Sequence, residues 1–310
     1  MRKKVIVDTD PGVDDAMMIL AALRSPELEV IGVTSVFGNA SGYATAQNAL
    51  RLVELEGNDN IPVARGSDRG LVVEAQMLGT MVHGEDGMGN TNPPLPKGKW
   101  LDISAAQFIA QKVLENPRQV TLLAVGPLTN VALALRLEPR IVELVEQVVI
   151  MGGSIGAGGN ISPVAEANIF HDPHAAEIVF SAGLPLVMVG LDVTLKVIQT
   201  RQYLDKIKAA NNPAGHLLRS ILPCYQRYHD QAYGMGGDIH THDPSALAYV
   251  LDPELFKVEE VPVYVETSGY GFGQTIADRR RQLGQRPPVS VCVEVDAPGV
   301  LALIEERLTR

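Results

Sequence analysis

The sequence predicts an α/β fold in which helices flank a mostly parallel central sheet, in a Rossmann-like arrangement. The main observation is that apolar runs of strand length alternate along the chain with amphipathic segments of helix length, which is typical of repeated βα units. A second observation is that several helical segments end at a proline or glycine, namely Pro26, Gly57, Pro117 and Gly183. In an open parallel sheet ligands bind at the carboxyl ends of the strands, so the functional site is expected there.

The individual elements follow from these patterns in chain order. Apolar runs predict strands over residues 3–7, 30–36, 120–125, 147–151 and 186–190. Helical periodicity between them predicts helices over residues 14–24, 41–55, 104–115, 128–136 and 173–181. Later, helices are expected over 200–209, 214–232 and 244–250, followed by β-rich stretches at 258–266 and 289–295. Residues 66–100 contain no predicted element, and loops of that length usually carry function.

Composition and charge argue against several classes of protein. The formal net charge of −10 makes nucleic acid a poor partner, because phosphate binding needs clustered Lys and Arg. The basic run 279–281 is interpreted as a solvated hairpin end. No apolar run approaches the roughly 18 residues that would span a membrane, and no secretory signal is recognised, so a cytoplasmic location is expected. Cys224 and Cys292 form no Cys-x-x-Cys pair and are expected to be inert buried thiols.

Four aspartates follow the first predicted strand, in the stretch "DTDPGVDD" at 8–15. Carboxylates this close repel one another unless a cation, or the free N–H groups of a helix N-terminus, compensates the charge. Further polar or glycine-rich loops follow the strands 30–36, 120–125 and 147–151, and parallel strands place such loops at one edge of the sheet. The sequence therefore predicts a cation site at this edge.

Two common loop motifs do not account for these residues. An EF-hand beginning at Asp8 would need an oxygen ligand at its fifth position and a glutamate at its twelfth, where the chain has Gly12 and Ile19. The glycine-rich loop at 151–159 lacks the Lys-Ser/Thr of a phosphate-binding loop, and its glycines lack the dinucleotide-binding spacing.

An aspartyl-phosphate-type phosphatase is an alternative, because Asp8-Thr9-Asp10 places two carboxylates two residues apart after a strand. That hypothesis predicts magnesium dependence and release of phosphate from a monoester. It leaves Asp14 and Asp15 unexplained.

Seven motifs in order along the chain resemble a known family. They are "DTDPGVDD" at 8–15, "FGN" at 37–39, "HGEDGMG" at 83–89, "VGPLTN" at 125–130, "MGG" at 151–153, "NISPVAEAN" at 160–168 and "HDP" at 242–244. Together they closely resemble the inosine–uridine-preferring nucleoside hydrolases, calcium-dependent enzymes that hydrolyse the N-glycosidic bond of ribonucleosides to ribose and free base. The resemblance runs from residue 4 to about 250, with a weaker echo in "GQTIADRR" at 273–280, and it implies a single nucleoside hydrolase domain over residues 1–310.

The resemblance implies a calcium (Ca2+) site. Its ligands would be Asp10, Asp15, Asp243 and the backbone carbonyl of Val125, which suits a cation that binds six to eight oxygens in irregular geometry. Many relatives have Thr where this chain has Val125, but only the main-chain oxygen would be used. Asp10 would also act as general base toward the calcium-bound water. Helix capping alone would explain Asp14 or Asp15 singly, but not the distant Asp243.

The resemblance also implies a ribose pocket. Asp14 would accept hydrogen bonds from the ribose hydroxyls, and Met151 would lie beneath the sugar. The pocket would be completed by Asn39, Asn160, Glu166 and Asn168. Loop capping is the structural alternative for each of these four polar residues, and core packing is the alternative for the methionine.

The departing base would be assisted by a proton donor. His242 is the first candidate because it precedes the ligand Asp243, and His83 is the second. Tyr225, Tyr228 and the neighbouring His229 lie on a predicted helix and could stack on the base or hydrogen-bond to it, with packing as the equal alternative.

Composition bears on substrate preference. The purine-specific branch of this family resembles a site in which tryptophans sandwich the base, whereas this chain has only Trp100, in a loop. Broad or pyrimidine-leaning specificity is therefore expected. A non-catalytic calcium-dependent nucleoside or ribose binding protein is a further alternative, and the resemblance suggests a homodimer or homotetramer.

Overall fold

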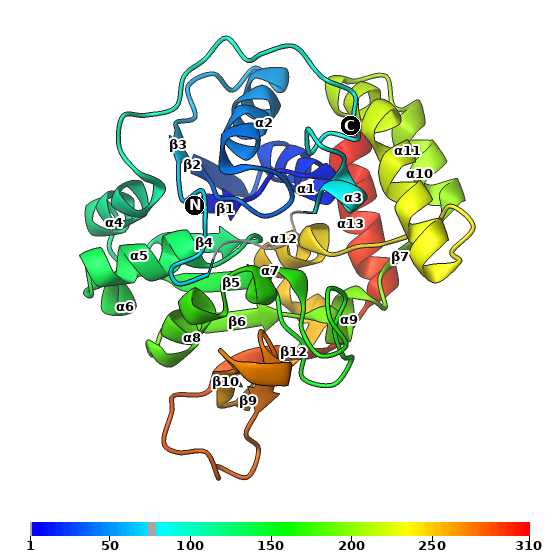
Figure 1. Ribbon diagram of the computed structural model, residues 1–310. Helices are drawn as coiled ribbons and strands as arrows, with labels where there is room; N and C mark the ends of the chain where they lie inside the picture. The colour runs from blue at the N-terminus through cyan, green and yellow to red at the C-terminus, as the bar shows by residue number, and fades with distance from the viewer. Residues whose placement is uncertain (1, 74–78) are drawn as a thin grey trace.

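A central eight-stranded sheet organises the protein, whose computed structural model describes residues 2–73 and 79–310 (Figure 1). The sheet order is β3-β2-β1-β4-β5-β6-β12-β9, and every neighbouring pair is parallel except β12 and the edge strand β9. The strands are β1 (Lys3–Thr9), β2 (Leu28–Ser35), β3 (Val63–Arg65), β4 (Val120–Ala124), β5 (Gln147–Met151), β6 (Leu186–Val189), β9 (Phe256–Val261) and β12 (Val289–Val295). The predicted mostly parallel α/β fold is confirmed.

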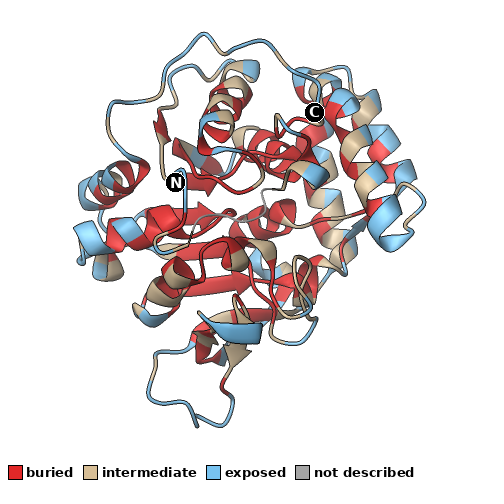
Figure 2. Cartoon of the chain, viewed as in Figure 1, coloured by how far each residue is buried: buried red, intermediate tan, exposed pale blue. Residues whose placement is uncertain are grey.

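Both faces of this sheet are covered, so its central strands are buried on both sides. In β1, Val5 and Val7 pack into one hydrophobic core and Ile6 packs into the other, because successive side chains point to opposite faces. Every residue of β4 and β6 is buried. Continuous apolar runs, rather than alternating ones, are what such doubly covered parallel strands require. In Figure 2 the strands are largely buried and exposed residues lie toward the outside.

The helices form two layers. One face is covered by α1 (Val13–Leu23), α2 (Gly42–Leu55), α10 (Arg201–Ala209), α11 (Pro213–Tyr233), α12 (Asp243–Leu251) and α13 (Ala297–Thr309). The other is covered by α4 (Ala105–Glu115), α5 (Thr129–Leu137), α6 (Ile141–Leu144) and α8 (Pro173–Ser181). Every residue of α1 from Val13 to Ala22 is buried, which explains why this helix is apolar almost all round.

Short elements complete the chain. The helices α3 (Thr80–His83), α7 (Ala167–His171) and α9 (Leu191–Thr194) lie in loops, and 3₁₀ turns occur at Pro253–Leu255 and Gly269–Gly271. Two small antiparallel sheets stand apart from the main one: β7 (Ile198–Gln199) with β8 (Ile239–His240), and β10 (Val263–Val265) with β11 (Thr275–Ala277). In the parts of the chain that the structure describes, no helix is long and apolar enough to cross a membrane.

The predicted strands and helices are all present, with ends shifted by at most two residues, except that the β-rich stretch 258–266 divides into β9 and β10 of different sheets. The segment 66–100 contains the unpredicted helix α3, and its residues 74–78 lie outside the described residues. The basic run at 279–281 is exposed. Cys292 is buried as predicted, whereas the prediction for Cys224 was wrong because this thiol is only half-buried, on α11 near the Val82 carbonyl of α3.

The C-terminal helix α13 is the largest element that the sequence analysis missed. Its signals are present in the sequence, since Asp296 caps the helix by accepting the Gly299 N–H and a proline follows in the first turn. Val300, Ile304 and Leu308 repeat every four residues and are fully buried. The short strands were missed for a different reason, because pairs and triplets of residues carry no usable periodicity.

Replacement of Phe108 by alanine tests the packing of α4 on the sheet. Its ring lies against Gly32 of β2 so closely that a Cβ at that glycine would be 2.2 Å from the ring, and Phe108 is 2 % exposed. We expect Phe108→Ala to lower the free energy of unfolding by about 3–5 kcal/mol, measured by denaturant unfolding. The control Leu133→Ala, at a 39 % exposed position, should cost only roughly 0.5 kcal/mol. Equal effects of both changes would contradict the packing described.

Candidate active site

A cavity of about 340 Å³ opens at the carboxyl edge of the sheet. It is lined by residues from the first turn of α1, from the loops after β2, β4 and β5, from α3, α7 and α11, and from the start of α12. All the residues proposed from the sequence line it except Asp10 and Asp15, which are buried beside it: the lining includes Asp14, Asn39, His83, Val125, Met151, Asn160, Glu166, Asn168, Tyr225, Tyr228, His242 and Asp243. The structure thus brings together side chains that are up to about 230 residues apart in the sequence.

The turn between β1 and α1 presents two of the aspartates. Gly12 is the N-cap residue of α1, and the Asp15 carboxylate accepts its N–H at 2.9 Å and also the hydroxyl hydrogen of Thr9. Asp14 and Asp15 therefore lie in the first helical turn, where the free N–H groups and the helix dipole favour negative charge. This explains locally why the chain tolerates adjacent buried carboxylates.

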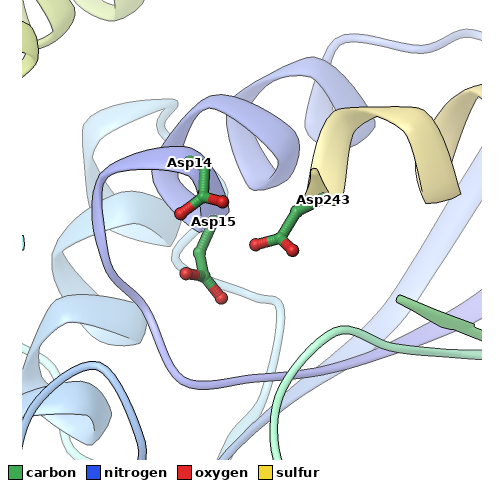
Figure 3. Close-up of side chains that lie close together, drawn as sticks. All are labelled: Asp14, Asp15 and Asp243. Carbon is green, nitrogen blue, oxygen red and sulfur yellow. The ribbon is translucent and has the colours of Figure 1, made fainter. Parts of the chain in front are cut away.

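Asp243 joins these two aspartates from the other end of the chain. It is the first residue of α12, and one carboxylate oxygen from each of Asp14, Asp15 and Asp243 lies within 4.8 Å of the others (Figure 3). Burial raises the pKa of all three carboxyls, that of Asp14 to about 6, and the neighbouring Asp14 charge raises the pKa of Asp15 and Asp243 further.

Asp10 lies beside this group, and the backbone at Gly38 and at Gly126 packs closely against its carboxylate. Its Oδ2 accepts the Asn39 N–H at 2.8 Å. A Cβ at Gly38, whose φ is +151°, would lie 2.0 Å from Oδ2, and a Cβ at Gly126 would lie 2.7 Å from Oδ1. Burial and the Asp15 charge raise the pKa of Asp10 well above its usual value. Glycine is therefore required on both sides of this carboxylate.

Asp8, the first of the four aspartates, has a different role. It is fully buried in β1 and does not line the cavity, and its Oδ1 accepts hydrogen bonds from the Thr34 hydroxyl and from Asn130 Nδ2. Asn130 also donates to the Ser35 carbonyl and accepts the Ser67 N–H, so the Asp8 side chain is part of a framework between neighbouring loops. Burial raises the pKa of Asp8 to about 6.

Asn168 and Glu166 organise the opposite wall. Asn168 Nδ2 donates to the carbonyls of Val125 at 2.8 Å and Met151 at 3.0 Å. Glu166 caps α7 and accepts the N–H groups of Asn168, Ile169 and Gly153, and burial raises its pKa to about 7. The sequence offered loop capping and a place in the pocket as alternatives for these residues. In the structure, Glu166 and Asn168 both bond to the backbone and line the cavity.

Asn39 and Asn160 each use one side-chain amide atom for a hydrogen bond within the protein. Asn39 Nδ2 donates to Asp15 Oδ2 at 2.8 Å, and Asn160 Oδ1 accepts the Ala167 N–H at 2.9 Å. Both side chains line the cavity, and no side-chain hydrogen bond is recorded for the second amide atom of either among the described residues, which leaves capacity to bind a polyol.

Of the two candidate histidines, His83 is buried and His242 is half-buried, and the pKa of each is lowered. His83 Nδ1 accepts the Val13 N–H at 3.1 Å, so the ring proton must reside on Nε2, and burial lowers the pKa of His83 to about 4. His242 Nδ1 is 2.9 Å from the Thr194 hydroxyl, and burial lowers its pKa well below the usual value. At neutral pH each ring can therefore act as a neutral N–H donor toward the cavity.

Several lining residues were not predicted. Met81 and Val82 come from the short helix α3, and His171 comes from α7, where no sequence signal singled them out. Tyr233 could have been found, because it lies four residues after His229 on α11 and helical spacing places both on one face. Trp100 is not among the lining residues and packs edge-on against Tyr43 instead.

The donor set fits a hard divalent cation. Asp10 Oδ1 and Asp14 Oδ1 are buried and have no hydrogen-bond partner among the described residues. Unpartnered buried carboxylate oxygens that repel one another are costly, and oxygen-only ligand sets of this kind bind Ca²⁺ or Mg²⁺. The geometry groups Asp14, Asp15 and Asp243 most tightly, whereas the sequence assigned Asp14 to the sugar and Asp10 to the metal.

Comparisons with known proteins identify the family. The model of the inosine-uridine preferring nucleoside hydrolases matches residues 5–302. This chain belongs to that family. It is 41 % identical over 315 residues to a probable uridine nucleosidase 2 of Arabidopsis thaliana, covering 99 % of this chain and 98 % of the relative. It is 40 % identical over 310 residues to the pyrimidine-specific ribonucleoside hydrolase RihA of Citrobacter koseri, covering 99 % and 98 %.

A solved structure confirms the relationship. The plant nucleoside hydrolase PpNRh1 superposes with a TM-score of 0.96 at 39 % sequence identity, covering 100 % of this chain and 99 % of the solved one. The sequence prediction that this protein is a nucleoside hydrolase, an enzyme acting on N-glycosyl bonds, is confirmed by these comparisons. The phosphatase alternative is not supported.

Replacement of Gly38 by alanine tests the close approach to Asp10 in this nucleoside hydrolase. The new methyl group would displace the carboxylate, so we expect nucleoside hydrolysis to fall at least about 100-fold in kcat/KM, since misplacement by about 1 Å can cost that much. The control is Gly57→Ala, where φ is also positive (+68°) but nothing lies within 4 Å. It should cost about 1 kcal/mol of stability and leave kcat/KM unchanged. A fully active Gly38→Ala enzyme would contradict the geometry.

Proposed function

We propose that the protein hydrolyses ribonucleosides to ribose and free base with a calcium ion in the carboxylate group, and that it prefers pyrimidine over purine nucleosides. The observation that carries the proposal is the convergence of Asp10, Asp14, Asp15 and Asp243 on a cavity lined by amides and histidines. Support for the base preference comes from the relatives named uridine nucleosidase and pyrimidine-specific ribonucleoside hydrolase, and from the absence of Trp100 from the described lining.

The metal would be held by Asp10, Asp15 and Asp243 with the Val125 carbonyl, as the family resemblance implies, and Asp14 lies close enough to take part. A bound divalent cation would supply charge that lowers the pKa of the attacking water and would bind sugar hydroxyls. The Val125 carbonyl accepts one hydrogen bond from Asn168, and no second one is recorded among the described residues, so a lone pair would be available for such a ligand role.

Asp10 would accept the proton from the attacking water. Its Oδ2 is engaged by the Asn39 N–H, while Oδ1 has no partner among the described residues and is the atom available for the proton. Gly38 and Gly126 fix the carboxylate from both sides, so it does not need to reorient during the reaction.

The ribose would be held by groups with spare hydrogen-bonding capacity. Asp14 accepts the Tyr225 hydroxyl hydrogen on Oδ2 at 3.2 Å and keeps Oδ1 for a sugar hydroxyl. The free amide atoms of Asn39 and Asn160 and the side chain of Asn168 supply further donors and acceptors. Positive charge that develops on the ribosyl ring as the bond breaks would be stabilised by the surrounding carboxylates.

The departing base would receive a hydrogen bond from a neutral imidazole. His83 has its ring proton on Nε2 and lies 5.2 Å, centroid to centroid, from the Tyr225 ring. His242 also lines the cavity, as the N-cap residue of α12. Neither ring needs to be protonated in advance, because a neutral N–H can donate as negative charge develops on the base.

Several sequence predictions have no test in the structure. The single domain over residues 1–310, the cytoplasmic location and the homodimer or homotetramer stay predictions. The non-catalytic binding protein is the second functional hypothesis. It would use the same carboxylates and sugar groups but would show no turnover.

Removal of calcium tests the metal proposal. We expect reducing-sugar release from uridine and cytidine to stop after chelation and to return when calcium is added back, with slower release from inosine and adenosine. Magnesium serves as the control cation, because its stricter octahedral geometry suits this irregular set of ligands less well. Full activity after complete chelation would exclude a metal role, and tight calcium binding without any release would favour the binding protein.

Replacement of Asp10 by asparagine tests the general base. The change removes the proton acceptor and keeps nearly the same shape, so we expect kcat to fall by about 10²–10⁴-fold. Calcium affinity should be measured alongside by calorimetry, since a lost metal would also reduce turnover. The matched control is Asp102→Asn at an exposed position, which should leave kcat unchanged. Normal turnover in Asp10→Asn would refute the proposed central step.

A further inference from the structure

The first turn of the glycine-rich loop between β5 and α7 is held by side chains outside the loop, whereas its later part also bonds within itself, since the Asn160 N–H donates to the Ala165 carbonyl at 3.2 Å. Residues 152–161 contain no helix or strand, yet Asn160 and Ile161 at its far end line the cavity. Gly153 has a φ of +75°, a backbone conformation that glycine adopts freely, so the loop has little intrinsic stiffness. An irregular segment that carries binding groups needs fixed anchors if those groups are to be positioned before the ligand arrives.

Thr275 of β11 supplies the first anchor. Its Oγ1 accepts the Ser154 N–H at 2.8 Å and donates its own hydrogen to the Ser154 carbonyl at 2.6 Å. The hydroxyl thus satisfies both backbone groups of one loop residue that is 121 positions away in the sequence. Thr275 is 3 % exposed, and a Cβ at Gly153 would lie 3.0 Å from its Cγ2, so loop and side chain are in tight contact.

Asp192 of α9 supplies the second anchor. Its carboxylate accepts the Ile155 N–H at 2.8 Å and the Ala157 N–H at 3.0 Å, directly after the residue held by Thr275. Thr275 and Asp192 therefore bind backbone groups of Ser154, Ile155 and Ala157, which belong to the same turn. Before this turn, the Gly153 N–H binds Glu166, so the anchored segment is also continuous with the opposite wall.

Thr275 contacts neither the cavity nor the carboxylate group. It lies on the small β10–β11 sheet, which Figure 1 draws outside the main sheet. The stretch "GQTIADRR" at 273–280 contains it, and no residue of that stretch is among those that line the cavity. Among the described residues, the recorded contacts of Thr275 that bear on the cavity are with Ser154 and Gly153 of the loop.

We propose that Thr275 is a positioning residue for nucleoside binding, which acts by fixing the loop that presents Asn160 and Ile161 to the substrate. This inference rests on the proposed function, because it takes the cavity to be the nucleoside site. The anchored loop carries Asn160 and Ile161, whereas the proton acceptor Asp10 is held by Asn39, Gly38 and Gly126 of other loops. Loss of the anchor is therefore expected to weaken substrate binding more than it slows bond cleavage.

Thr275→Val is the central variant, because valine keeps the shape and removes the hydroxyl. We expect KM for uridine to rise about tenfold, the effect of about 1.4 kcal/mol of lost hydrogen bonding, while kcat changes less than about threefold. Thr275→Ser keeps the hydroxyl and should restore KM to within about twofold. The matched control is Thr121→Val at a buried site in β4, which should leave KM unchanged.

Amide hydrogen exchange gives a readout that does not depend on turnover. We expect the peptide covering residues 153–161 to exchange faster in Thr275→Val and at the wild-type rate in Thr275→Ser, with the rest of the protein unchanged. Equal KM values for Thr275→Val and wild type, or equal defects in the valine and serine variants, would overturn the inference. A wild-type protein without any nucleoside hydrolysis would instead refute the proposed function, and the exchange data would still test the anchor.

Discussion

Mutual repulsion among buried carboxylates is the constraint on which the rest of the site depends. Asp10, Asp14, Asp15 and Asp243 lie together at the carboxyl edge of the sheet, where burial and neighbouring charges raise the pKa of each. Such an arrangement is stable only if protons or a cation compensate the charge, and the helix N-terminus at Gly12 compensates only part of it. Compensation of this carboxylate charge is therefore a condition for a stable site, whatever ligand the cavity binds.

The framework around these groups consists largely of backbone atoms and small residues. Gly38 and Gly126 let two loops approach Asp10, and Asn130 joins Asp8 to the loops after β2 and β3. Asp10 is thus held by close packing, whereas Asp8 and Asp15 are held by hydrogen bonds. A parallel sheet favours such a site because the loops that follow several of its strands begin at the same edge.

Side chains in the cavity serve the framework and the ligand at the same time. Glu166 caps a helix, Asn168 binds two backbone carbonyls, and Asn39 bridges two aspartates, yet each also lines the cavity. A capping role and a binding role are therefore not alternatives for such residues. The chemical reason is that amides and carboxylates offer more hydrogen-bonding sites than one framework contact uses.

The sequence by itself determined the order of the main strands and helices, the parallel sheet and the residues expected at its edge, because apolar periodicity and motif order are local properties of the chain. Residue type and spacing alone could not separate Asp8 from the three aspartates after it, and the family resemblance that assigned the other three gave no structural role to Asp8. It also could not show that Thr275 holds Ser154, or that His83 has its proton on Nε2. Only the tertiary structure decided these points, because each depends on a partner that chain connectivity does not specify.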